Sequence, residues 1–101
     1  MASPIFAARA AVTRKSVRTS RRFRAAALKA WYAIAREADW ANFAELKEQF
    51  RSASAVGERV VFNIAGNKYR MVTWINFEFR IIYVRFVGTH REYDEVDVKN
   101  V

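Results

Sequence analysis

VVFNIAGNKYRMVTWINFEFRIIYVRFVGTHREYD, residues Val60 to Asp94, is the stretch that decides the fold. It contains three strand-like runs joined by very short connections. The first run, 60–65, alternates apolar side chains and ends at Gly66-Asn67, a dipeptide typical of a two-residue hairpin turn. The second run, 69–77, also alternates, so the two runs predict a β-hairpin.

The third run, about 80–87, is almost wholly apolar after Arg80 except for Arg85, as expected for an interior strand that is covered on both faces. Gly88 is expected to end it, and turn geometry alone would explain this glycine. Residues 89–94 should form a turn or a single helical turn. Together the three runs predict an antiparallel meander.

Two helices are expected before the meander. From Arg21 to Ala38 apolar residues recur at steps of three and four, and the alanine content favours an amphipathic helix with a basic outer side. Asn42 and Glu45 are spaced like a capping box at the start of a second, short helix that reaches Phe50. Residues 51–57 have the composition of a loop. Helices on one face of a small antiparallel sheet make an α+β domain, in which the opposite face can hold polar groups.

The first 22 residues diverge from this clear pattern. Residues 5–7 could form a short edge strand after Pro4. Residues 9–22 are rich in arginine, alanine and serine and indicate a short helix that breaks near Thr19, with Ser20 as N-cap of the next helix. A chain of 101 residues has room for one hydrophobic core, so residues 1–101 are expected to form a single domain.

Positive charge is concentrated in the first third of the chain. The chain has 18 lysines and arginines, 10 aspartates and glutamates, and a formal net charge of +8. Residues 1–36 hold half of the basic residues and no acidic one. A chain this basic is expected to meet a polyanion such as RNA, DNA, an anionic membrane or an acidic protein partner, although a basic tail on a soluble protein would look the same.

Composition excludes several classes of site. The chain has no cysteine, hence no disulfide, no thiolate metal site and no cysteine nucleophile, which fits the cytoplasm. No apolar run approaches the roughly 18 residues that a membrane helix needs, so no membrane-spanning helix is expected. The partners expected for the chain do not include a membrane. His90 is the only histidine, and the acidic residues at 92–97 are better explained by neighbouring arginines. Neither a metal nor another cofactor is therefore expected.

Basic and titratable side chains gather where the second predicted strand begins and the third ends. In an antiparallel pair, the start of one strand lies beside the end of the next. Lys68 and Arg70 are therefore expected near Arg85, and near His90 and Tyr93 in the following turn. RNA phosphodiester cleavage needs one group to take a proton from a 2′-hydroxyl and another to protonate the leaving 5′ oxygen, for which histidine and tyrosine are suited. Arginine or lysine would stabilise the charge that develops on the phosphate oxygens.

Each of these residues also has a simpler explanation. His90 could be an exposed or capping side chain, and Lys68 a solvated residue of the hairpin. Arg85 could pair with an acid such as Asp94. Trp74 and Phe77 are more often core residues, although aromatic side chains also stack on unpaired RNA bases. Spacing alone therefore leaves open a noncatalytic RNA-binding module or a protein-interaction subunit.

Several segments resemble the HigB-type toxins of bacterial toxin–antitoxin modules, within the wider RelE-like group of mRNA endonucleases. The motifs that carry the resemblance are VVFNIAGNKYR and IIYVRFVGTHREYD. The segments 31–40 and 46–50 are also similar, and the resemblance covers about Ala26 to Asp97. The family typically opens with a clear first strand, from which residues 1–22 depart.

The resemblance implies a RelE-like α+β toxin that cleaves mRNA on the translating ribosome without a metal. It also implies a HigA-type helix-turn-helix antitoxin that neutralises the toxin, with operator DNA contacted only through that antitoxin. Carried onto this chain, it implies that His90 and Tyr93 transfer protons and that Arg70 stabilises the transition-state charge. It also implies that three further basic residues bind the RNA: Lys68, Arg85 and Arg91.

Overall fold

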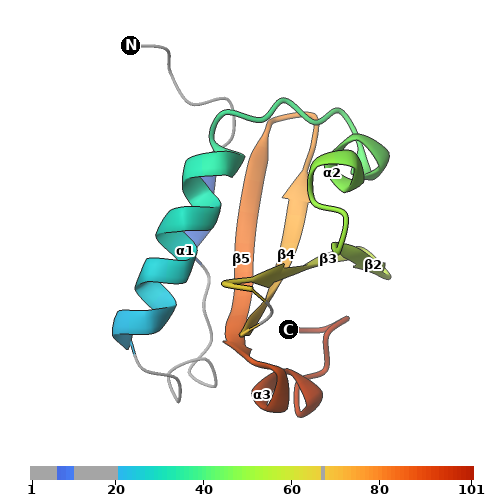
Figure 1. The fold of residues 1–101 in the computed structure, drawn as a ribbon. Coiled ribbons are helices and arrows are strands. Elements are labelled where there is room, and N and C mark those ends of the chain that lie inside the picture. The colour runs from blue at the N-terminus through green and yellow to red at the C-terminus, as the bar shows by residue number, and fades with distance from the viewer. Residues whose placement is uncertain (1–6, 11–20, 67) are drawn as a thin grey trace.

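The computed structural model describes residues 7–10, 21–66 and 68–101, which form an α+β domain (Figure 1). This confirms the fold class expected from the sequence. The elements in chain order are β1 (Ala7–Ala10), α1 (Arg21–Ala35), α2 (Phe43–Gln49), β2 (Ser54–Val56), β3 (Arg59–Ile64), β4 (Tyr69–Asn76), β5 (Ile81–Thr89) and α3 (His90–Asp94).

The described strands form one sheet in the order β1-β5-β4-β3-β2. The meander β3-β4-β5 is antiparallel as predicted, and its bounds agree with the expected runs to within two residues. At the β3–β4 turn Lys68 N donates to the Ala65 carbonyl at 3.2 Å, and Gly66 has a φ of 60°, as a tight hairpin requires. The hairpin prediction is therefore confirmed.

The predicted edge strand also exists, but it lies at Ala7–Ala10 and pairs in parallel with β5. The expectation of a helix from residue 9 onward is therefore wrong for Arg9 and Ala10, because backbone pairing with β5 outweighs the helix propensity of an alanine-rich segment. The rest of that predicted helix, and the proposed cap at Ser20, lie outside the described residues.

Two further expectations need correction. Residues 51–57 are not all loop, because Ser54–Val56 pairs with β3 across a turn in which Gly57 has a φ of 60°. This edge strand is short and mostly exposed, so its composition resembles a loop. Helix α1 ends at Ala35, three residues before the expected end; Ala38 N then donates to the Ala35 carbonyl in a tightened last turn.

Helix α2 begins as its sequence predicts. Asn42 has an extended backbone and its side chain accepts a hydrogen bond of 3.0 Å from Glu45 N. Leu46 is the buried residue of this helix. Trp40 precedes the helix and donates its indole N–H to Gln49 at 3.0 Å. This bond holds the α1–α2 connection against the end of α2.

Helices α1 and α2 pack on one face of the sheet, as predicted. Trp31 of α1 makes an edge-to-face contact with Phe62 of β3, which in turn contacts Phe50 after α2. This core continues across the sheet through side chains of β3, β4 and β5; it includes Val60, Ile64, Tyr69, Met71, Ile75, Ile82, Val84 and Val87. Figure 1 shows α1 running alongside β5.

The opposite face, called the outer face below, is not purely polar. Val61, Val72 and Phe86 form a second buried cluster there, and the C-terminal segment covers it with Tyr93 and several valines: Val96, Val98 and Val101. Arginines occupy neighbouring positions on this face. The expectation that the outer face holds polar groups is thus confirmed only for part of the face.

A β-bulge interrupts the β4–β5 ladder at Arg85. Val72 pairs with Phe86, whereas the next residue, Thr73, pairs with Val84, so Arg85 is the extra residue. Tyr83 and Arg85 are only partly buried, which corrects the expectation that this strand is covered on both faces. The expectation came from the apolar composition of the strand, which does not show that one residue of it is left unpaired.

No helix of the described ranges is both long and apolar enough to cross a membrane.

Candidate active site

Helix α3 begins directly at the end of β5, beside the start of β4 (Figure 1). Thr89 caps the helix: its hydroxyl accepts from Glu92 N at 3.2 Å, and Thr89 N donates to Glu92 Oε1 at 2.9 Å. This reciprocal capping box satisfies two backbone groups at the helix start. The capping box therefore determines the direction in which the chain turns away from the sheet at His90, the next residue.

Arg70 and Tyr93 meet at this end of the sheet. Arg70 lies opposite Gly88 in the β4–β5 ladder. Its guanidinium carbon lies 4.6 Å from the centre of the Tyr93 ring, within the range of a cation–π contact. The structure thus brings together two of the three residues expected to act in catalysis.

Gly88 allows α3 to lie close to the sheet, and it does so without forming a turn. It lies within β5, and a Cβ atom built on it would come within 2.6 Å of Phe86 Cζ and 3.2 Å of Glu92 Cβ. Phe86 is fully buried and cannot easily move aside. The turn explanation is therefore wrong for Gly88, whose lack of a side chain lets α3 lie close to the sheet.

His90 is the first residue of α3 and is partly buried. Its Nε2 is buried and has no hydrogen-bond partner within the described residues. His90 and Tyr93 are three residues apart in a helix, which places their Cβ atoms about 5–6 Å apart on one side. Among the described residues, no protein group therefore competes for this nitrogen.

The other basic candidates surround this site at different positions. Arg91 is exposed on α3. Arg85 extends from the bulge, where its guanidinium carbon lies 5.8 Å from the Tyr83 ring centre, and its Nε has no hydrogen-bond partner among the described residues. The simpler explanation, an ion pair with Asp94, is not observed.

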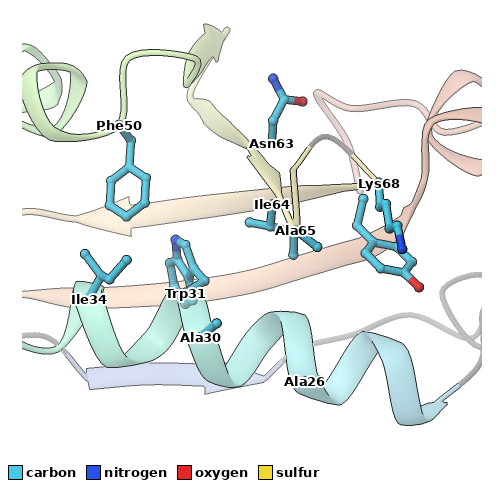
Figure 2. Close-up of a pocket in the computed structure, with 10 residues that line it drawn as sticks. Ala26, Ala30, Trp31, Ile34, Phe50, Asn63, Ile64, Ala65 and Lys68 are labelled. Carbon is cyan, nitrogen blue, oxygen red and sulfur yellow. The ribbon is translucent and has the colours of Figure 1, made fainter.

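Lys68 points to the other side of the sheet. It is exposed and lines a pocket of about 430 Å³ between α1 and the β3–β4 hairpin (Figure 2). The rest of the pocket wall is mainly apolar and includes Trp31, Ile34 and Phe50. The structure therefore places Lys68 at the same end of the sheet as Arg70, but not in the Arg70–Tyr93 contact.

No three histidine, cysteine, aspartate or glutamate side chains of the described part gather as a metal site would. Glu92 of α3 has a structural role instead, because it belongs to the capping box.

Residue spacing did not single out Arg59 or Tyr83. Arg59 pairs with Trp74, which pairs with Tyr83, so the three lie in one row across the outer face. The rings of Trp74 and Tyr83 have centres 5.2 Å apart and are inclined by 36°. Alternation along each strand could have indicated that these side chains share one face. The pairing between strands could not be predicted, because the sequence does not show the bulge in β5.

The arrangement around α3 has the groups that phosphodiester chemistry requires. Arg70 supplies a fixed positive charge beside a phenol, and His90 supplies an imidazole within one helical turn. Such a set can bind a phosphate and move protons at adjacent oxygens.

Comparison with known proteins assigns this chain to a family of toxins. Residues 24–96 match the family described as HigB_toxin, RelE-like toxic component of a toxin-antitoxin system. The match includes most of α1, the meander and α3, and therefore every residue of the candidate site.

Two curated relatives illustrate the extent of the similarity. The mRNA interferase toxin HigB of Escherichia coli strain K12 is 50% identical over 34 residues, which are 34% of this chain and only 33% of that protein. The mRNA interferase HigB of Escherichia coli O6:H1 is 28% identical over 75 residues, covering 71% of this chain and 73% of that protein.

Proposed function

This chain belongs to the HigB family of RelE-like toxins, and on that premise we propose that it is an mRNA endonuclease that inhibits translation. The observation that carries the proposal is the Arg70–Tyr93 contact of 4.6 Å, one helical turn from His90. The names of the relatives, mRNA interferase, support the same activity.

The proposed reaction is an internal transfer at phosphorus. The 2′-hydroxyl oxygen of one nucleotide attacks the adjacent phosphorus, its proton is taken up, and the bond to the 5′ oxygen of the next nucleotide breaks as that oxygen receives a proton. His90 and Tyr93 carry out the two proton transfers. Arg70 faces the phosphate and stabilises the additional negative charge of the transition state.

Three further basic residues bind the RNA backbone in this proposal. Arg85 lies on β5 and Arg91 on α3, where they would contact phosphates beyond the reacting one. Lys68 lies around the end of the sheet, where it would contact RNA that leaves the site. Each such contact contributes a salt-dependent part of the affinity, because bound cations are released from RNA phosphates.

The proposed setting is the bacterial cytoplasm, with mRNA on the ribosome as substrate and no requirement for a metal ion. A HigA-type helix-turn-helix antitoxin would neutralise the protein. In the complex of the two, only the antitoxin would contact operator DNA. A ribosome surface of rRNA phosphates fits a chain with a net charge of +8.

The test is induced expression in a bacterium of the wild-type chain, His90→Ala and Arg70→Ala, with growth measured and mRNA 5′ ends mapped. We expect growth arrest and in-frame cuts for wild type and neither for the variants. Purified protein is then added to a translating extract and to the same RNA without ribosomes, both as isolated and after bound metal has been stripped with EDTA and the EDTA removed.

Phe79→Ala is the matched control, because this side chain is 68% exposed in the β4–β5 turn. It should cut as wild type does. A wild-type protein that is folded but leaves growth and mRNA intact would refute the nuclease assignment. Cutting that requires a divalent ion, or that proceeds equally without ribosomes, would refute those two parts alone.

A further inference from the structure

The outer face carries an aromatic pair at some distance from the proposed catalytic residues. Trp74 of β4 and Tyr83 of β5 are cross-strand partners with ring centres 5.2 Å apart. Both are partly exposed, whereas the other two tryptophans, Trp31 and Trp40, are only 4% exposed. Trp74 and Tyr83 belong to neither hydrophobic cluster of the described residues.

An arginine lies beside each ring of the pair. Arg59 is the cross-strand partner of Trp74 on β3 and donates from Nη2 to the Val101 carbonyl at 3.1 Å. Arg85 lies over Tyr83 at 5.8 Å. The Nε atoms of both arginines are buried and have no hydrogen-bond partner within the described part of the chain. Two rings and two guanidinium groups thus lie next to one another on the outer face.

This row lies on the same face as the proposed active site but is separated from it by the C-terminal segment, which covers Val72 between them. Arg70, Val72 and Trp74 alternate along β4, so all three side chains lie on the outer face. At roughly 3.3 Å per residue, Trp74 is about 13 Å from Arg70 along the strand. A ligand that contacts both positions must therefore be extended, as single-stranded RNA is.

We propose that Trp74 and Tyr83 form a stacking subsite for an unpaired RNA base, with Arg59 and Arg85 binding the adjoining phosphates. The inference rests on the proposed function and extends it from the reacting phosphate to a neighbouring nucleotide. Stacking on exposed rings of a sheet is how proteins hold splayed RNA bases, and arginine beside the rings adds attraction to the backbone.

Intrinsic tryptophan fluorescence tests this subsite directly, since Trp74 is the only partly exposed tryptophan of the three. The probe is a short unstructured RNA with 2′-O-methyl groups, which lacks the attacking hydroxyl and cannot be cut. We expect the wild-type emission to be quenched on binding. An oligonucleotide of equal length with phosphates but no bases should bind more weakly and cause no quenching.

Variants separate stacking from general electrostatic binding. Trp74→Ala and Tyr83→Ala should each weaken RNA binding by about 5- to 100-fold. Trp74→Phe should retain most of the affinity, because the ring remains, but should lose the quenching. Phe79→Ala removes an aromatic side chain that is more exposed and lies outside the row, so it should bind as wild type does. Circular dichroism verifies that each variant is folded.

Unchanged RNA affinity in folded Trp74→Ala, or equal binding of the base-free oligonucleotide, would overturn the stacking subsite. The result is independent of cleavage, because the probe cannot react. A wild-type protein that cuts mRNA in a translating extract but shows neither quenching nor a Trp74 effect would disprove this inference and leave the proposed function intact. Quenching and a loss of RNA affinity in Trp74→Ala, without any mRNA cleavage, would support the stacking subsite and refute the proposed function.

Discussion

The guanidinium of Arg70 lies over the ring of Tyr93, with its central carbon 4.6 Å from the ring centre. The two residues belong to different elements, the strand β4 and the helix α3, and are 23 positions apart in the chain. The contact fixes a positive charge and a phenol side by side. It also joins α3 to the sheet, because Tyr93 packs against the outer-face cluster.

Arg70→Ala should reduce mRNA cleavage by about 10²- to 10³-fold, the usual loss when one stabilising donor is removed from a transition state. The free energy of unfolding should change by no more than about 1 kcal/mol, because a cation–π contact near the surface contributes little. Cleavage in a translating extract and urea unfolding measure the two effects. Arg70→Lys should recover part of the activity; loss of stability in proportion to activity would show a merely structural role.

Tyr93→Phe separates the phenol from the ring. The ring would still pack under Arg70, so the unfolding free energy should stay within about 0.5 kcal/mol of wild type, as for a surface substitution. Cleavage should fall by about 10²-fold or more if the hydroxyl transfers a proton. Full activity of Tyr93→Phe, measured by mapping mRNA 5′ ends, would assign Tyr93 to packing alone.

Gly88→Ala should destabilise the protein by about 1–3 kcal/mol, the usual cost of adding an atom to a closely packed site. The added Cβ would lie 2.6 Å from the buried Phe86 ring. Gly66→Asn is the matched control, since nothing lies within 4 Å of a Cβ there and asparagine tolerates its positive φ. Urea unfolding should place Gly88→Ala well below Gly66→Asn; equal stability would contradict the close approach of α3.

Thr89→Ala removes the cap of α3 and should lower the free energy of unfolding by about 1 kcal/mol. Because His90 follows the cap directly, cleavage should fall as well. Thr89→Ser keeps the hydroxyl that accepts from Glu92 N, so it should restore both stability and cleavage. Thermal unfolding and a cleavage assay on the three proteins would decide; an inactive but stable Thr89→Ser would argue against a positioning role.

Local patterns in the sequence determined much of this protein. Alternation over 60–65 and 69–77 with Gly66 between them predicted the hairpin, and the steps of three and four after Arg21 predicted α1. Antiparallel geometry then placed Arg70 beside the end of the third strand, where Gly88 is its partner. These features follow from the period of each element and from turn chemistry, which a few neighbouring residues encode.

Only the tertiary structure decided the register and the contacts across elements. The extra residue at Arg85 moves every later β5 side chain to the opposite face from the one that simple alternation assigns, because the side-chain period of a strand is two. The row of Arg59, Trp74 and Tyr83 depends on pairing across three strands, and the need for glycine at 88 depends on how closely α3 packs. Such relationships are set by long-range packing, so no single stretch of the sequence contains them.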